Sequence, residues 1–229
     1  MMKVAVIRFP GSNCDRDAYM ALKGRVKDDP IMVWHQEVSL PKVDLIILPG
    51  GFSYGDYLRS GAIAARSPIM TEVIKAANDG RYLLGICNGF QILTETRLLP
   101  GTLMHNRDLK FIGKKTYIKV TGSSIFSDGY QQNQVLQMPI AHGEGNYFAS
   151  KDDIKRLTEN DQIIFRYSDV EGNITEEANP NGSMDNIAGI VNLKKNVMGM
   201  MPHPERVVDA VQGKTDGNIL FDYLAKKLS

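Results

Sequence analysis

The sequence predicts an α/β fold with a mostly parallel central sheet, helices on its faces and antiparallel additions in the second half. In the first hundred residues, short apolar runs alternate with stretches of helical periodicity, which is typical of parallel sheets covered on both faces. Beyond them, strand-like runs follow one another with few helices between. A length of 229 residues with 43% hydrophobic content suits one sizeable core. We therefore expect a single domain over residues 1–229.

The first half should contain four strands and three helices. Residues 3–9 are predicted to form a buried strand. Ser12 with Asp15 three positions later resembles a capping box in which a shorter acid replaces Glu, and it predicts the start of a helix over 12–23. The other expected elements are strands at 31–34, 43–48 and 82–86 and helices at 67–79 and 88–96. Ligands of such sheets bind beyond the carboxyl ends of the strands, so the residues that follow them are candidates for a site.

The second half differs because few helices separate its strands. One is expected at 152–158, and an amphipathic helix is expected at 218–227. The expected strands are 116–121, 137–141, 163–167, 187–191 and 197–201. Their close succession predicts antiparallel pairing, which needs only short connections.

Charge and cysteine usage narrow the function classes. The 27 basic and 26 acidic residues give a net charge of +1 without a basic stripe, so we expect no nucleic-acid partner. The apolar start is cut off by Arg8, too early for a signal peptide or membrane helix, and two cysteines without a Cys-x-x-Cys predict no disulfide framework and no metal site. The nucleotide-binding patterns Gly-x-x-x-x-Gly-Lys-Ser/Thr and Gly-x-Gly-x-x-Gly are missing. A reduced, cytoplasmic protein without membrane contact is expected.

The segment Gly85-Ile86-Cys87-Asn88-Gly89 follows an apolar run and opens a helix, which is the pattern of a nucleophile elbow with cysteine as the nucleophile. The chain must turn sharply at Cys87, and the bracketing glycines remove Cβ atoms that would clash in the turn. The start of a helix favours a thiolate, because its N–H groups are unpaired and its dipole is positive there. We therefore predict that Cys87 is a catalytic nucleophile.

A thiolate nucleophile needs a base, and the base needs an orienting group. His203 follows an expected strand and stands between two prolines, which hold the backbone extended. Glu205, two positions on, can accept from the ring N–H of His203 and so fix its tautomer. Acyl transfer also needs an oxyanion hole, for which the backbone N–H groups of Asn88 and Gly51 are the candidates.

Other reactive side chains have plainer interpretations. Cys14 also follows a glycine-containing turn but lacks the glycine brackets, so we interpret it as a structural residue of a helix start. His142 is a rival base that we prefer as a wall of the pocket. His35 and His105 have no other candidate catalytic residues near them in the sequence and are expected at the surface. Asp56 and Arg59, in the loop after Gly51, are expected to form a surface ion pair.

Together the motifs resemble those of the class I (triad) glutamine amidotransferases, a family with a flavodoxin-like fold. The resemblance lies in Gly85-Ile86-Cys87-Asn88-Gly89-Phe90-Gln91 and in Pro202-His203-Pro204-Glu205. Within the family, the segments 10–15, 49–61 and 141–145 are similar to small glutaminase subunits that serve an ATP-dependent synthetase of purine biosynthesis.

The resemblance implies that Cys87, His203 and Glu205 form a triad, with Gly51 and Asn88 as the oxyanion hole. It implies that L-glutamine is hydrolysed to glutamate through a Cys87 thioester and that the ammonia passes to a large synthetase subunit, with a small third subunit bridging the two. ATP and Mg are then expected on the large subunit, and no cofactor or metal in this chain. The residues implied to bind glutamine are Gln91, His142, Gly143 and Glu144.

The loop over 52–61 is too long for a simple connection and is expected to become ordered on contact with the synthetase. Its candidates for partner contact are Phe52, Tyr54, Tyr57 and Arg59. Three alternatives stay open: the glutaminase subunit of another synthetase, a stand-alone γ-glutamyl cysteine hydrolase, and a non-enzymatic interaction subunit. Glutamine turnover without a partner would favour the hydrolase, whereas the intact triad argues against a non-enzymatic subunit.

Overall fold

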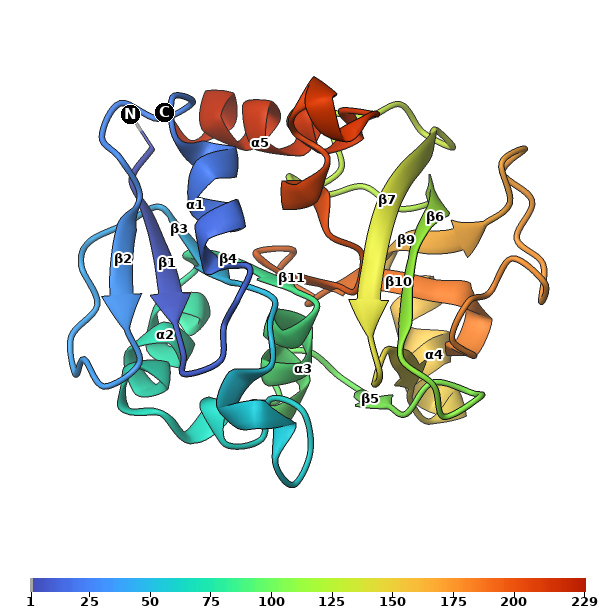
Figure 1. Ribbon diagram of the computed structural model, residues 1–229, viewed down its shortest axis with the longest axis horizontal. Coiled ribbons are helices and arrows are strands. Elements are labelled where there is room, and N and C mark those ends of the chain that lie inside the picture. Colours follow the sequence, from blue (N-terminus) through green and yellow to red (C-terminus); the bar gives the residue numbers. More distant parts are fainter. Residues whose placement is uncertain (1) are drawn as a thin grey trace.

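A nine-stranded sheet runs through the protein with the strand order β2-β1-β3-β4-β11-β10-β9-β6-β7 (Figure 1). The computed structural model describes residues 2–229, apart from the side chain of Gln212. The strands of this sheet are β1 (Val4–Arg8), β2 (Ile31–Trp34), β3 (Leu45–Leu48), β4 (Tyr82–Ile86), β6 (Ile112–Val120), β7 (Val135–His142), β9 (Ile163–Ser168), β10 (Ile187–Val191) and β11 (Val197–Met200). The helices are α1 (Asp15–Leu22), α2 (Pro68–Asn78), α3 (Asn88–Glu95), α4 (Lys151–Glu159) and α5 (Asp216–Lys227).

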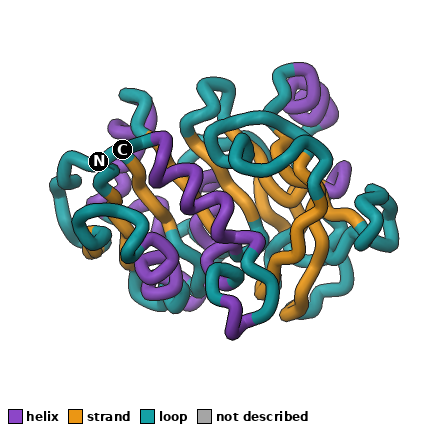
Figure 2. Tube along the Cα trace, turned by 90° about the horizontal axis from the view of Figure 1, so that it is seen from above, coloured by secondary structure: helices purple, strands orange, loops and turns teal. Residues whose placement is uncertain are grey.

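The parallel part of the sheet comes mainly from the first half of the chain. β2, β1, β3, β4 and β11 pair in parallel, so that β11 returns from the second half to lie beside β4. Every residue of β3 and β11 is buried, as expected for strands covered on both faces. α3 packs on β3, β4 and β11, whereas α1 packs on β1 and α5, and helices flank the layer of strands in Figure 2. The carboxyl ends of β4 and β11 are therefore neighbours.

The antiparallel part extends the sheet from β11 through β10, β9, β6 and β7. It has as many strand pairings as the parallel part, and β7 alternates buried with half-buried residues, as a strand with one face in the core does. The predicted fold class, a parallel sheet with antiparallel additions and flanking helices, is confirmed. Within residues 2–229 no helix is long and apolar enough to cross a membrane.

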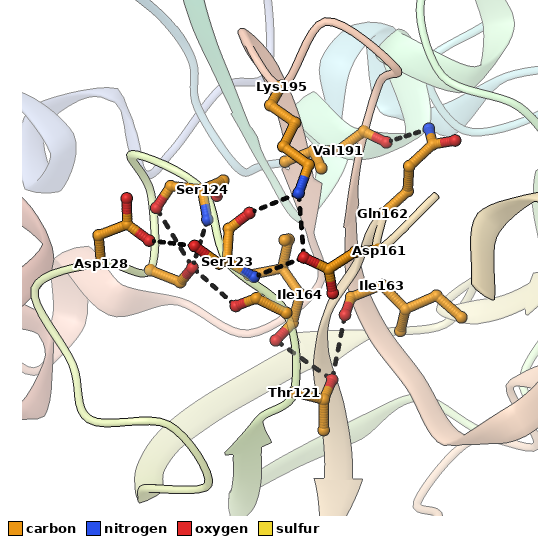
Figure 3. Close-up of polar contacts among 12 residues, drawn as sticks. Thr121, Ser123, Ser124, Asp128, Asp161, Gln162, Ile163, Ile164, Val191 and Lys195 are labelled. Carbon is orange, nitrogen blue, oxygen red and sulfur yellow. Dashed lines mark hydrogen bonds and ion pairs between the residues drawn. The ribbon is translucent and has the colours of Figure 1, made fainter. Parts of the chain in front are cut away.

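Polar contacts tie three turns together at the amino end of β11 (Figure 3). Lys195 Nζ donates to the Ser123 carbonyl at 2.9 Å and lies 3.0 Å from Asp161 Oδ2, which also accepts the Ser123 N–H at 3.2 Å. Thr121 Oγ1 donates to the Ile163 carbonyl at 3.1 Å. This network joins the antiparallel strands at the end of β11 opposite to His203, so it holds the sheet without entering the predicted site.

Three local features differ from the sequence-based expectations. The capping box predicted at Ser12 is wrong: α1 begins after Cys14, and Ser12 Oγ accepts the N–H of Phe9 at 3.3 Å, closing the preceding turn. β6 begins at Ile112 rather than at residue 116. The sequence did not indicate these first residues, because they are mostly exposed and show no apolar alternation. A second sheet pairs β5 (Thr102–Met104) with β8 (Asn146–Phe148), and strands of three residues are too short to give a periodic signal.

Candidate active site

Cys87 lies at the turn from β4 into α3, as predicted, in a strained conformation with φ +51° and ψ −105°. Positive φ is rare for a residue with a side chain and persists only where the surroundings impose it. The glycines around it are required by packing: a Cβ on Gly85 would lie 2.7 Å from the backbone of Gly89, and a Cβ on Gly89 would collide with the Leu48 carbonyl. The elbow thus exists because α3 is pressed against the ends of β3 and β4.

The Cys87 thiol lines a cavity of about 170 Å³ at the carboxyl ends of the parallel strands. This volume is several times the ~30 Å³ share of a water molecule but below the 300–1,000 Å³ of sites for drug-sized ligands. The cavity therefore suits a molecule of amino-acid size. Its lining residues are Gly51, Phe52, Asp56, Ser60, Cys87, Gln91, His105, Phe111, Ala141, His142, Gly143 and Glu144.

His203 and Glu205 form a buried pair directly after β11. His203 Nδ1 lies 2.6 Å from Glu205 Oε1, and both side chains are almost inaccessible to solvent. The backbone N–H of His203 donates to the Pro139 carbonyl at 2.9 Å, which fixes the turn to β7. Pro204 then starts the short η4 turn (Pro204–Arg206). The stiff presentation predicted from the two prolines therefore holds, with Glu205 in a 3-10 turn rather than in extended backbone.

The charges around His203 favour its protonated form. Burial alone lowers the pKa of this imidazole, but the Glu205 carboxylate, together with the Cys87 and Cys14 sulfurs, outweighs burial and raises the pKa well above its ordinary value. Because Nδ1 points at Glu205, Nε2 is the nitrogen left for proton transfer, and it has no hydrogen-bond partner among residues 2–229. An imidazolium beside a sulfur is the arrangement that stabilises a thiolate.

Gly50 brings the nucleophile and the imidazole together. A Cβ at this position would lie 2.7 Å from His203 Cε1 and 3.4 Å from Cys87 Cβ, so the imidazole and the cysteine pack over the same bare Cα. Three residues from distant segments thereby converge because β4 and β11 are neighbouring parallel strands. The sequence alone did not indicate this role for Gly50.

Of the two predicted oxyanion donors, Gly51 lines the cavity together with Cys87, and Asn88 follows Cys87 in the chain. Gly51 has φ +142°, and a Cβ there would come within 2.7 Å of Ser12 Cα and Asn13 N, so only glycine fits. Asn88 is the first residue of α3, where a backbone N–H has no partner within the helix. Its side-chain Oδ1 accepts the Ser53 N–H at 3.2 Å, which ties the loop after Gly51 to the elbow. The roles of Gly51 and Asn88 as donors stay predictions.

The residues implied to bind glutamine form one wall of the cavity. Gln91 Nε2 donates to the Glu144 carbonyl at 2.6 Å, and its Oε1 accepts from Asn88 Nδ2 at 2.9 Å. His142 is buried, and burial together with the nearby His203 lowers its pKa to about 4. A ring with this pKa is neutral at pH 7. His142 is thus a cavity wall, as expected, and His203 is the better base.

Cys14 lies much closer to the triad than the sequence indicated. It is the N-cap residue of α1, and a Cβ on Gly50 would lie 3.2 Å from its sulfur. Cys14, His203 and Glu205 offer ligand atoms within 4.8 Å of one another, a set that could hold a metal ion. However, Arg206 Nη2 already donates to Cys14 Sγ at 3.1 Å, and a guanidinium at the sulfur opposes a cation. We assign no metal here.

The structure changes the expectations for the charged residues after Gly51 and for His35. Arg59 does not pair with Asp56: its guanidinium makes a bidentate ion pair with Glu95 of α3, at 2.6 and 2.7 Å. Asp56 instead lines the cavity. His35 is buried rather than at the surface, and its Nδ1 forms a hydrogen bond of 2.7 Å with the Tyr54 hydroxyl. His105 is exposed, as expected.

The candidates for partner contact fall into two groups. Tyr54 and Arg59 make contacts within their own chain: the Tyr54 hydroxyl also lies 3.1 Å from Ser67 Oγ, and Arg59 pairs with Glu95 while its side chain stays exposed. Phe52 and Tyr57 are exposed, and so is the neighbouring Leu58 at 93%. All four residues stay predictions for partner contact.

Comparison with known proteins defines the class first. The model of the CobB/CobQ-like glutamine amidotransferase domain matches residues 1–219, so the chain belongs to this family of glutamine amidotransferases. Its curated relatives narrow the class. The chain is 54% identical to phosphoribosylformylglycinamidine synthase subunit PurQ of Synechocystis, over 96% of this chain and 99% of that one. It is 50% identical to the protein of the same name from Salinibacter ruber, over 99% and 97%.

Solved structures agree with these relatives. The structure of PurLQS from Thermotoga maritima contains a chain with 42% sequence identity and a TM-score of 0.87, and the match covers 100% of both chains. Another glutamine amidotransferase from Thermotoga maritima matches with a TM-score of 0.55 at 15% identity, over 99% of this chain and 94% of that one. The second likeness shows a shared fold alone.

Proposed function

We propose that this chain is the glutaminase subunit of phosphoribosylformylglycinamidine synthase, which hydrolyses glutamine and hands the ammonia to a synthetase subunit. The observation that carries the glutaminase activity is the convergence of Cys87, His203 and Glu205 on one small cavity. The choice of synthetase rests on the identity of 50–54% to PurQ proteins over almost the whole length of both chains.

The reaction begins with attack of the Cys87 thiolate on the carboxamide carbon of L-glutamine. A carbon–sulfur bond forms, and the carbonyl oxygen becomes an oxyanion that accepts hydrogen bonds from the Gly51 and Asn88 N–H groups. Loss of one such donor in other enzymes costs ~10²–10³ in kcat. His203 Nε2 then gives its proton to the amide nitrogen, the carbon–nitrogen bond breaks, and ammonia leaves behind a glutamyl thioester.

Hydrolysis of the thioester restores the enzyme. The neutral His203 takes a proton from water, the hydroxide adds to the thioester carbon, and collapse of the second tetrahedral intermediate expels the Cys87 thiolate with glutamate as product. Glu205 accepts a hydrogen bond from Nδ1, so that Nε2 of His203 is oriented for proton transfer in both half-reactions.

The ammonia is consumed on another chain. The large synthetase subunit would use it to convert formylglycinamide ribonucleotide to the amidine, with ATP and Mg bound there and none on this chain. A small third subunit would bridge the two. Exposed Phe52, Tyr57 and Leu58 stand next to the cavity on the loop after Gly51, so we assign the synthetase contact to them. We also propose a cytoplasmic location, because both cysteines are free thiols.

The test is reconstitution with candidate synthetases. The chain is co-purified with the large and small subunits of the synthase, and glutamate and amidine are measured with glutamine as the only nitrogen source. We expect weak glutaminase activity from the chain alone and strong stimulation in the complex. Equal glutaminase rates with and without the partner would instead favour a stand-alone γ-glutamyl hydrolase. Stimulation only by a different synthetase would reassign the subunit.

A further inference from the structure

The thiol of Cys14 lies beside the catalytic pair, although the mechanism above assigns it no role. Cys14 directly precedes α1 and is 2% exposed. Its Sγ lies within 4.8 Å of a ring nitrogen of His203 and of a carboxylate oxygen of Glu205. A Cβ on Gly50 would lie 2.7 Å from His203 Cε1 and 3.2 Å from Cys14 Sγ. The sulfur and the Cε1 edge of the imidazole therefore share the space that a side chain at position 50 would fill.

Hydrogen bonds on both sides hold this sulfur in place. Arg206 Nη2 donates to Cys14 Sγ at 3.1 Å, and Sγ donates to Asn13 Oδ1 at 3.2 Å. The guanidinium is itself anchored, because Arg206 Nε donates to Asp17 Oδ2 of α1 at 3.2 Å. The backbone N–H of Cys14 donates to the Gly50 carbonyl at 3.3 Å. The thiol is thus a fixed point that joins the start of α1 to the η4 turn.

The hydrogen bonds of His203 do not fix its ring by themselves. Nδ1 is held by Glu205 Oε1, whereas Nε2 has no hydrogen-bond partner among residues 2–229. A single hydrogen bond at Nδ1 leaves the ring free to swing about that bond, yet Nε2 has to stay aligned for both proton transfers. A polarizable sulfur at a ring edge is a favourable contact, and here it also blocks the swing.

We infer that Cys14 is a positioning residue of the triad, which holds the edge of the His203 ring so that Nε2 is aligned with the Cys87 sulfur. The inference rests on the proposed glutaminase function and adds a fourth side chain to its machinery. Cys14 touches neither glutamine nor the transferred proton in this account. Its sulfur acts through the imidazole alone.

The contact has an electrostatic consequence that can be measured. The titratable and charged groups around the ring are Glu205 and Arg206 from η4, Cys87 from the elbow, Cys14 from the start of α1 and His142 from β7. Burial lowers the pKa of His203, but Glu205 and the two sulfurs raise it, so that it lies well above its ordinary value. Removal of the Cys14 sulfur therefore lowers this pKa, and the loss of imidazolium is greatest at alkaline pH.

The experiment combines a titration of His203 with kinetics of the complex. NMR of the Cε1–H groups of the four histidines follows the titration in the full chain. A Cys87→Ala background removes the titration of the nucleophile, and His203→Gln identifies the resonance. Cys14→Ala removes the sulfur, whereas Cys14→Ser keeps a donor and an acceptor in its place. Ala21→Gly is the matched control, because Ala21 is fully buried on α1 and its loss loosens the same helix while the sulfur stays.

We expect Cys14→Ala to lower the titration midpoint of His203 by about one pH unit, the shift typical of losing one contact to a charged group. Cys14→Ser should recover most of this shift, and Ala21→Gly should match the wild type. In the complex with intact Cys87, Cys14→Ala should lower glutamine-dependent kcat roughly 10-fold at pH 7 and further at pH 9, with KM nearly unchanged.

An unchanged midpoint in Cys14→Ala would overturn the inference, and so would a loss of kcat that Ala21→Gly reproduces, because Cys14 would then only fill space. A wild-type complex without glutaminase activity would instead contradict the proposed function. The midpoint of His203 decides the question of Cys14 in that case too, since the NMR titration needs no substrate.

Discussion

Replacing Asp56 by asparagine should make the ligand-free protein more stable above pH 6. An aspartate in an unfolded chain ionises near ~3.9. In the folded chain, burial and the neighbouring Glu144 raise the pKa of Asp56 to about 6. The folded state therefore holds this proton more tightly than the unfolded state. The stability it contributes is fully present below the unfolded pKa and is lost as the pH rises through the folded pKa.

The size of the effect follows from the shift. A difference of about two pKa units corresponds to ~3 kcal/mol at 1.36 kcal/mol per unit. Asp56 is only half-buried, so solvent screening reduces this, and we expect ~1 kcal/mol at pH 8. For a chain of 229 residues, that raises Tm by about 2–4 °C.

The assay is a pair of thermal melts, at pH 5 and pH 8, for the wild type, Asp56→Asn and the control Glu171→Gln, whose side chain is exposed outside the cavity. The contributions of groups distant from Asp56 cancel in the difference between variant and wild type, whereas Glu144 loses a repulsive neighbour. Arg59, Glu95 and His105, the other charged groups around this end of the cavity, are unchanged in the variant. A Tm difference that is the same at both pH values, or a variant less stable than wild type at pH 8, would refute the reasoning.

His203→Ala should lower glutamine-dependent kcat by ~10⁶ and Glu205→Gln by ~10⁴, because the first removes the proton carrier and the second only its orienter; steady-state glutamate release measures both, and the reverse order would reassign the base. Gly51→Ala, whose Cβ would meet the Ser12–Asn13 backbone, should cost ~10²–10³ in kcat without slowing alkylation of Cys87 by iodoacetamide. Leu58→Asp should abolish stimulation by the synthetase and keep the basal rate, whereas Val211→Asp, equally exposed, should change neither; retained stimulation in Leu58→Asp would move the interface elsewhere.

Much of the site could be predicted from the sequence because its chemistry follows strand ends. Cys87 and His203 stand directly after β4 and β11, and the glycine and proline patterns around them are local. The sequence did not predict that β4 and β11 are neighbours, because pairing between strands more than a hundred residues apart leaves no local pattern in the sequence. The triad could thus be predicted from its parts, but its assembly could not.

Residues whose role depends on long-range packing were the ones misplaced. His35 and Cys14 have unremarkable sequence neighbours, yet the fold buries His35 against Tyr54 and brings Cys14 beside the catalytic imidazole. We expected Asp56 to form an ion pair with Arg59, three positions away, because oppositely charged neighbours in the sequence suggest a surface contact. The competing acid, Glu95, belongs to α3, and only the folded structure shows that it takes Arg59 and leaves Asp56 to the cavity.

The central claim is that Cys87 makes ammonia from glutamine for a synthetase site on another chain. The most direct measurement is amidine formation by the complex that carries Cys87→Ala, with glutamine or with ammonium chloride as the nitrogen source. We predict that glutamine supports no synthesis above background, while ammonium supports the wild-type rate. Glutamine-dependent synthesis in this variant, or loss of both activities in a complex that still assembles, would contradict the claim.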